Sequence, residues 1–239
     1  MTGPGTAAPQ AVLLDLDDTL VDTRSAFRAG IADVVSRWMP HLDDAGRAEA
    51  LRHWVRDETG AYAAYTRGEL TFAGQRRVRA DRLHAHLGGP GLTEPAFTAW
   101  QDAYDAAVRA AWRPHPDGLR LLAALGAAGV AVGIVTNAGR AYQEAKLVAV
   151  GMAGLPVLAC MDDLGRGKPD PEVFRLACRR LGVPPGAAAY VGDELDVDAR
   201  GARDAGLAGI WLDRHGTGRT PPDVPVIRTL DELPALLGI

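Results

Sequence analysis

Short apolar runs alternate with helix-like patterns in two parts of the chain, residues 11–21 and 113–239. The runs are AVLLDL, VAVGIVTN, LPVLAC, AAAYVGD, LAGIWL and VPVIRTL, and amphipathic stretches such as DPEVFRLACRRLG separate them. Strands that alternate with helices of this length indicate a parallel sheet that is covered by helices on both faces. We therefore expect these two parts to form one Rossmann-like α/β core domain.

Residues 22–112 have a different pattern, because apolar residues recur there at helical spacing and few strand-like runs occur. Stretches such as SAFRAGIADVVSRWM and PAFTAWQDAYDAAVRAAW predict a bundle of four or five helices inserted after the first strand. The first ten residues, MTGPGTAAPQ, lack the basic start and apolar centre of a signal peptide. We expect residues 1–10 to be a flexible tail.

Composition excludes several classes of protein. A net charge of -4 over 239 residues gives no basic footprint, so we expect no nucleic-acid partner. The longest uncharged run, residues 121–138, is interrupted by glycines and short for a membrane span, so we expect no membrane segment. Two cysteines are too few for a disulfide framework, which favours a reducing cytoplasm and a packing role for both. A cytoplasmic monomer or homodimer fits these limits.

Polar residues follow three of the predicted strands. Asp15 and Asp17 end the first run, Thr136 and Asn137 the second, and Asp193 the fourth. In an open parallel sheet, ligands bind in the crevice beyond the carboxyl ends of the strands. We therefore expect these side chains to converge on one site.

The first of these stretches, VLLDLDDTLVD at residues 12–22, holds three close carboxylates. Asp15 and Asp17 are two apart, so along an extended chain they project to the same side while Asp18 points away. Two carboxylates facing one spot suggest a hard cation such as Mg²⁺, and Asp193 can complete its site. For the later acids Glu194 and Asp196, stabilisation of a helix N-terminus is the simpler explanation.

The stretch GKPDP places Lys168 in a loop of restricted geometry, because Pro169 keeps it out of the helical conformation. A lysine there can balance a carboxylate cluster and a phosphate together, whereas the plainer alternative is a solvated loop lysine. Thr136 and Asn137 offer a hydroxyl and backbone N–H groups that suit phosphate oxygens. Their plainer alternative is a strand-to-loop turn.

Taken together, DLDDT, TNAG, GKPDP and GDELDVD, in this order, resemble the motifs of the haloacid dehalogenase (HAD) superfamily. The resemblance covers residues 11–21 and 113–212. The insertion at residues 22–112 is similar to the helical cap domain of the phosphatase-rich branch, which contains phosphoglycolate phosphatase-like and nucleotidase-like members. It implies a HAD-type α/β fold with an inserted cap.

The resemblance also implies roles for the strand-end residues. Asp15 would be the nucleophile that forms an aspartyl-phosphate, and Asp17 would be the general acid and base. Mg²⁺ would be held by the carboxylates of Asp15 and Asp193 and by the backbone carbonyl of Asp17. The remaining implied roles are phosphoryl binding by Thr136 and the Asn137 amide, charge neutralisation by Lys168, and orientation of Lys168 or of a metal-bound water by Asp198.

One position separates the activities of this superfamily. Dehalogenase members act without a metal and lack the second acid of the DxD motif, whereas Asp17 is present here. The resemblance therefore implies a magnesium-dependent phosphatase that acts on a small phosphorylated metabolite. The alternatives are a phosphomutase with the same chemistry and a non-catalytic protein that binds a phospholigand.

The inserted helices carry four arginines near one helix–loop junction, Arg67, Arg76, Arg77 and Arg79. Any of them can reach a substrate anion, but a solvated basic face is the favoured interpretation. The tryptophans of this region are expected to pack the bundle.

Overall fold

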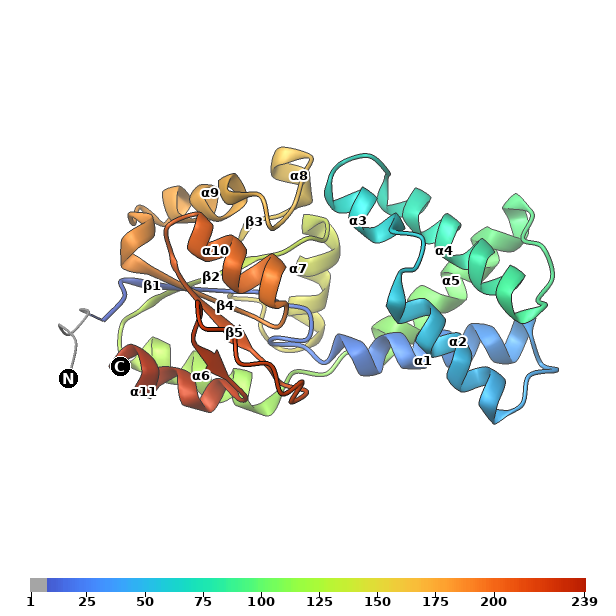
Figure 1. Cartoon of the computed structure of the whole chain (residues 1–239), viewed down its shortest axis with the longest axis horizontal. Helices are drawn as coiled ribbons and strands as arrows, with labels where there is room; N and C mark the ends of the chain where they lie inside the picture. The colour runs from blue at the N-terminus through green and yellow to red at the C-terminus, as the bar shows by residue number, and fades with distance from the viewer. Residues whose placement is uncertain (1–7) are drawn as a thin grey trace. The chain divides into compact units, whose positions relative to one another are not determined.

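The computed structural model describes residues 8–239, and the chain divides into two compact units. The core unit comprises Met1–Asp22 and Pro114–Ile239, and the helical unit comprises Thr23–Arg113 (Figure 1). Of the tail predicted at residues 1–10, residues 1–7 lie outside the described residues.

The core unit contains a sheet of six strands in the order β3-β2-β1-β4-β5-β6, and every neighbouring pair is parallel. Each strand lies in one of the six apolar runs. Their bounds are β1 Ala11–Leu14, β2 Ala131–Val135, β3 Val157–Ala159, β4 Ala188–Gly192, β5 Ala208–Leu212 and β6 Val226–Ile227. The prediction of a Rossmann-like parallel sheet is confirmed.

Helices cover this sheet. The bounds are α6 Pro116–Ala127, α7 Arg140–Ala149, α8 Met161–Leu164, α9 Pro171–Leu181, α10 Gly201–Asp204 and α11 Leu233–Leu237. Figure 1 shows α9 and α10 on one face of the sheet and α6 and α11 on the other. Because both faces are covered, every residue of β1 and β4 is buried, which explains why these strands are apolar throughout.

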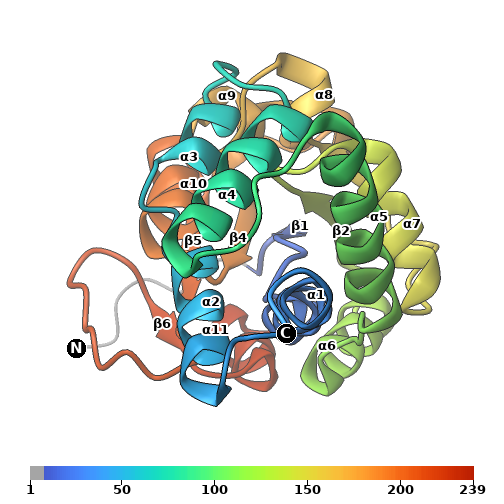
Figure 2. The same ribbon diagram turned by 90° about the vertical axis from the view of Figure 1, so that its right-hand side faces the viewer.

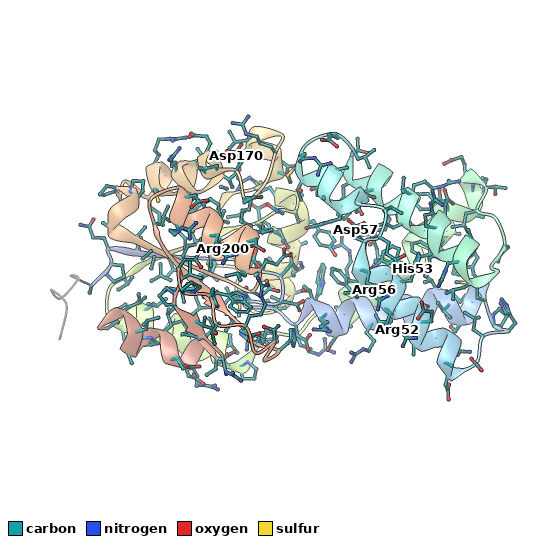
Figure 3. All side chains as sticks on the ribbon, in the orientation of Figure 1. Arg52, His53, Arg56, Asp57, Asp170 and Arg200 are labelled. Carbon is teal, nitrogen blue, oxygen red and sulfur yellow. The ribbon has the colours of Figure 1, made fainter. Side chains whose placement is uncertain are left out.

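Short turns complete the core unit, and local sequence sets several of its boundaries. Two 3₁₀ turns, Pro185–Ala187 and Leu230–Glu232, and one π-helical turn, Leu195–Arg200, connect the larger elements. Asp170 caps the N-terminus of helix α9, and its side chain accepts a hydrogen bond from the Glu172 N–H at 2.8 Å (Figure 3 labels Asp170).

The hydrophobic core between α9, α10 and the sheet includes Phe174, whose ring meets the Tyr190 ring edge-on at 4.9 Å. Cys160 and Cys178 are buried and free, which confirms their expected packing role. Within residues 8–239, no helix combines the length and apolar character that a membrane span requires.

The helical unit has five helices, where the sequence predicts four or five. The bounds are α1 Thr23–Trp38, α2 Asp44–Arg56, α3 Ala61–Thr66, α4 Phe72–Leu87 and α5 Glu94–Ala110. Helix α1 packs along α5, and Figure 2 views α1 almost end-on. The rings of Trp54, Trp100 and Tyr104 form the centre, with the Trp100 and Tyr104 rings stacked at 5.4 Å, as expected for tryptophans that pack the bundle.

The interpretation of the four arginines as a solvated basic face is wrong for Arg76 and Arg79. Arg76 is 4% exposed, donates to Asp105 at 2.7 Å and covers the Tyr104 ring at 4.6 Å. Arg79 covers the Trp54 ring at 4.2 Å and donates to the Trp54 carbonyl at 2.6 Å. Planar guanidinium groups stack on aromatic faces, so these two arginines belong to the packing of the bundle.

Candidate active site

The site lies where the strand order of the sheet reverses. Strands β2 and β3 follow β1 to one side, whereas β4 lies on the other side of β1. Asp15 directly follows β1, and its N–H donates to the Val191 carbonyl of β4 at 2.9 Å. Asp193 directly follows β4, and Trp211 Nε1 donates to its carbonyl at 2.8 Å. The two acids therefore emerge side by side at the switch point, the usual ligand position in such sheets.

Lys168 is the centre of the hydrogen-bond network at this edge. Its side chain is 3% exposed, and Nζ donates to Asp15 Oδ1 at 2.6 Å, to Asp198 Oδ1 at 2.7 Å and to Tyr190 Oη at 2.8 Å. These three bonds use every hydrogen of the ammonium group. Burial alone lowers the pKa of Lys168, but the charges of Asp15 and Asp198 outweigh burial and raise the pKa well above its usual range. Lys168 is therefore held as a cation.

The Asn137 side chain fixes the loop that carries Lys168. Asn137 Nδ2 donates to the Lys168 carbonyl at 2.9 Å, and Asn137 Oδ1 accepts from the Lys168 N–H at 2.6 Å. Only glycine fits at position 167, because a Cβ there would lie 2.3 Å from Asn137 Oδ1. The sequence predicts only the Asn137 backbone amide as a functional group, and its side chain adds this positioning contact.

Asp198 reaches the site from the π-helical turn after β4. Its Oδ1 also accepts from Tyr190 Oη at 3.0 Å, and its Oδ2 accepts from the Glu194 N–H at 3.0 Å. Gly192 permits this approach, because a Cβ there would lie 2.3 Å from the Asp198 carboxyl carbon. Both Asp198 oxygens are thus already hydrogen-bonded. This fits the implied role of orienting Lys168 better than a role as a direct metal ligand.

Three carboxylates gather beside the single cation Lys168. Asp15, Asp193 and Asp198 each offer an oxygen, and these atoms lie within 4.8 Å of one another. Burial raises the pKa of Asp15 to about 7, with Lys168 opposing the shift and Asp198 and Asp17 adding to it. Burial, with the charges of Asp15 and Asp198, raises the pKa of Asp193 well above its usual range. Fully ionised, the three carboxylates would carry more negative charge than Lys168 balances, and the raised pKa values reflect this imbalance.

This donor set suits a hard divalent cation, because Mg²⁺ prefers oxygen ligands and a dication offsets the excess charge. Asp15 and Asp193 are the side chains best placed to hold it. The Asp17 carboxylate has other partners, so the prediction of Asp17 as a ligand depends on its backbone carbonyl.

The Asp17 carboxylate is bound from helix α7. Lys146 Nζ forms a short ion pair with Asp17 Oδ1, and Gln143 Nε2 donates to Asp17 Oδ2 at 2.6 Å. The same Gln143 nitrogen donates to Thr136 Oγ1 at 2.7 Å. That the Asp15 and Asp17 carboxylates face one cation stays a prediction, because Asp15 gathers with Asp193 and Asp198 whereas the Asp17 carboxylate is bound by Lys146 and Gln143. Each carboxylate has its own lysine.

Sequence reasoning found the strand-end residues and missed three of their partners. Tyr190, Gln143 and Lys146 read as ordinary members of a buried strand and an amphipathic helix. One signal was present for Lys146: of 26 Lys and Arg residues, only Lys146 and Lys168 are lysines. A residue type this rare, and buried, marks a position where arginine does not substitute.

The additional acid Asp196 lies outside the site. Its side chain is 67% exposed and pairs with Arg200 at 2.6 Å, four residues later (Figure 3 labels Arg200). Asp196 also lies in the first turn of the π-helical segment Leu195–Arg200, the N-terminal position that the sequence predicts for it.

Comparison with known proteins supports the resemblance to the HAD superfamily. The haloacid dehalogenase-like hydrolase family matches residues 9–206. The chain belongs to this family. Its curated relatives place this HAD-like hydrolase in the phosphatase branch of the superfamily. The phosphoserine phosphatase of Thermus thermophilus is 30% identical over 92% of this chain and 95% of its own length. The N-acetylmuramic acid 6-phosphate phosphatase of Pseudomonas aeruginosa is 32% identical over 82% of this chain and 78% of its own length.

Solved structures establish the fold. A HAD hydrolase of Bacillus subtilis, crystallised with magnesium, superposes with a TM-score of 0.79 at 22% identity, covering 98% of this chain and 100% of that chain. The L-2-haloacid dehalogenase of Xanthobacter autotrophicus superposes with a TM-score of 0.71 at 20% identity, covering 96% of this chain and 98% of that chain. Phosphatase and dehalogenase activities therefore share this fold, so particular residues must distinguish them.

Proposed function

We propose that this HAD-like hydrolase is a magnesium-dependent phosphatase that hydrolyses a small phosphorylated metabolite through an aspartyl-phosphate on Asp15. The observation that carries the proposal is the arrangement at the switch point. A buried Asp15 lies beside Asp193 and Lys168, and a second acid, Asp17, is held two residues later. The curated relatives named above are phosphatases of a phosphoamino acid and a sugar phosphate, which supports a small phosphomonoester as substrate.

In the first step, an Asp15 carboxylate oxygen attacks phosphorus while the bond from phosphorus to the leaving oxygen breaks. Asp17, protonated for this step, gives its proton to that oxygen, so the product leaves as an alcohol. Thr136 and the Asn137 amide bind the phosphoryl oxygens, and Lys168 supplies positive charge beside Asp15. Bound Mg²⁺ supplies further positive charge against the phosphoryl group.

In the second step, water attacks phosphorus on the opposite side from Asp15. Asp17, now a carboxylate, takes a proton from this water, and the bond between phosphorus and the Asp15 oxygen breaks. Inorganic phosphate leaves, and both acids return to their starting protonation states. The two steps together therefore consume only the phosphate ester and one water molecule.

The helical unit at Thr23–Arg113 is proposed as the cap domain that selects the substrate. Its position after the first motif, between Asp22 and Pro114 of the core unit, supports this role. The cytoplasmic location and the monomeric or homodimeric state stay predictions.

The test is a phosphate-release screen of the purified chain across sugar phosphates, nucleotides, phosphoglycolate and amino-acid phosphates, with Mg²⁺ and with a chelator. We expect release from at least one class with Mg²⁺ and its loss with chelator. Phosphorus NMR of the products separates hydrolysis from isomerisation by a mutase. Tight ligand binding without phosphate release would instead favour a non-catalytic binding protein.

A further inference from the structure

Both lysines of this chain bind the first motif. Arginine supplies every other side-chain cation, and both lysines are almost fully buried, with 3% of Lys168 and 1% of Lys146 exposed. Lys168 binds Asp15, which belongs to the site described above. Lys146 binds Asp17, and no motif of the family resemblance includes Lys146. An ammonium group is more compact than a guanidinium group, which suits a lysine in this buried position.

Lys146 acts together with Gln143. The two residues are three apart on α7, so they lie on the same face of the helix. Lys146 engages Asp17 Oδ1 and Gln143 engages Asp17 Oδ2, so both carboxylate oxygens are held from one helix. An ionised carboxylate only accepts hydrogen bonds, so the Gln143 amide must turn its nitrogen toward Asp17.

This orientation of Gln143 also determines what the Thr136 hydroxyl can do. Thr136 Oγ1 accepts from Gln143 Nε2 at 2.7 Å and from the Ala138 N–H at 3.3 Å. A hydroxyl oxygen has two acceptor sites, and both are then occupied. The hydroxyl hydrogen is left to donate, which is the polarity that a phosphoryl oxygen requires.

The buried amide of Gln143 costs the fold stability. Its side chain is fully buried, and Oε1 has no hydrogen-bond partner within residues 8–239. A buried acceptor without a partner destabilises a fold, so an apolar residue would serve packing better. The hydrogen bonds from Gln143 Nε2 to Asp17 and Thr136 explain why a glutamine occupies this position.

We propose that Gln143 and Lys146 are a positioning pair for phosphoryl transfer, which holds the Asp17 carboxylate in place and makes Thr136 a hydrogen-bond donor to the phosphoryl group. The inference rests on the proposed phosphatase function. Neither residue touches the substrate in this scheme, and both act through groups that do. Lys146 acts through Asp17 alone, whereas Gln143 acts through both Asp17 and Thr136.

The two residues should therefore fail in different ways. Lys146→Met disturbs proton transfer to the leaving group, so kcat on an alkyl phosphate falls about 10- to 100-fold, the scale of a misplaced reacting group. On p-nitrophenyl phosphate, whose leaving group needs little protonation, the rate of the phosphorylation step, measured as the burst of p-nitrophenol, falls several-fold less, whereas hydrolysis of the aspartyl-phosphate is slowed for both esters. Gln143→Met also raises KM for both esters, because Thr136 loses its fixed polarity. The matched control is Glu144→Met, on the same helix but exposed, which should behave as wild type on both esters.

A spectroscopic test requires neither metal nor turnover. With ¹⁵N-labelled lysine, the full chain has only two side-chain ammonium groups, so NMR of Nζ gives two signals. Lys146→Met removes one signal and assigns it. Asp17→Asn should shift that signal and leave the other, whereas Asp15→Asn should shift the Lys168 signal most.

The outcomes separate this inference from the proposed function. If wild type releases phosphate from no ester, the proposed function fails. If wild type is active but Lys146→Met and Gln143→Met retain wild-type kinetics, or if Lys146→Met slows the phosphorylation step equally with both esters, the positioning pair is wrong. If Lys146→Met does not fold, Gln143→Met and the Asp17→Asn spectrum decide, with Asp15→Asn identifying the Lys168 signal: an unshifted Lys146 signal overturns the inference, and a shifted one supports it.

Discussion

Buried cations occur in two regions of this protein, and their surroundings differ. At the sheet edge, Lys168 faces two carboxylates, and Asp193 adds a third beside them. In the helical unit, Arg76 faces the single carboxylate of Asp105 and two aromatic rings. In the second region one carboxylate has its own cation, whereas in the first region three carboxylates share Lys168. Such an excess of buried carboxylates, rather than a buried charge as such, marks a place prepared for a cation.

The largest expected effect is at the sheet edge. Asp15→Asn removes the nucleophile, so phosphate release should fall at least about 10⁴-fold, the scale of losing an attacking group. The fold should persist, because the substitution removes a buried carboxylate whose pKa is raised to about 7. The measurement is phosphate release together with circular dichroism. Asp196→Asn is the matched control, because Asp196 is exposed, and it should retain full activity. Equal losses in both variants would contradict the assignment of Asp15.

The second-largest effect is expected in the helical unit, at the Arg76–Asp105 ion pair. Arg76→Met breaks a buried ion pair and a stacked contact, so the free energy of unfolding should fall by about 3 kcal/mol. Activity per folded molecule should change by less than about twofold, because Arg76 has a packing role. Chemical denaturation and kcat/KM measure the two quantities. A large loss of kcat/KM with unchanged stability would show that the helical unit uses Arg76 on the substrate.

The third effect follows from the excess negative charge. Mg²⁺ at about 100 times its dissociation constant should raise the free energy of unfolding by about 2.7 kcal/mol, by mass action. Asp193→Asn removes a ligand and part of the charge, so this gain should be largely lost. Thermal unfolding with Mg²⁺ and with chelator measures the gain. An equal gain in wild type and Asp193→Asn would place the cation elsewhere.

The smallest effect concerns Asp117 in the core unit, whose carboxylate is paired with Arg214. Burial alone raises the pKa of Asp117, but hydrogen bonds from Arg214, Leu230 and Thr229 outweigh burial and lower it from 3.8 to about 2. A lowered pKa stabilises the fold above the unfolded value and loses that stabilisation as pH falls toward 2. Asp117→Asn should therefore cost about 2 kcal/mol at pH 7.

The same comparison at low pH sharpens this prediction. The difference between wild type and Asp117→Asn should shrink steadily between about pH 4 and pH 2, measured by urea unfolding. The exposed Asp204→Asn is the control and should show a much smaller change. A difference that stays constant over this range would mean that Asp117 acts through packing rather than charge.

The sequence predicted what depends on local pattern. Apolar runs located all six strands, and the polar residues at their ends located Asp15, Thr136 and Asp193, because parallel strands end at a common edge. The GKPDP stretch located Lys168. The pairing of Lys146 with Asp17 joins residues 129 positions apart and depends on which face of α7 meets the sheet. Spacing along the chain does not determine that contact.

The buried arginines also depend on contacts between residues that are distant in the sequence. A charged residue is ordinarily exposed, so Arg76 and Arg79 favoured a solvated face. Their burial depends on aromatic rings from other helices, Tyr104 for Arg76 and Trp54 for Arg79. Such contacts exist only once the bundle has formed, which is why periodicity within one helix did not reveal them.

The most direct test of the central claim is to trap the intermediate on Asp15. In Asp17→Asn, an activated aryl phosphate still phosphorylates Asp15, but water attack lacks its base, so the second step is slow. Mixing this variant with p-nitrophenyl phosphate and Mg²⁺ should give a burst of one p-nitrophenol per active site. Mass spectrometry after acid quench should then find one phosphoryl group, on the peptide that contains Asp15. Steady turnover with no phosphoryl group on the chain, or a phosphoryl group on another residue, would contradict the account.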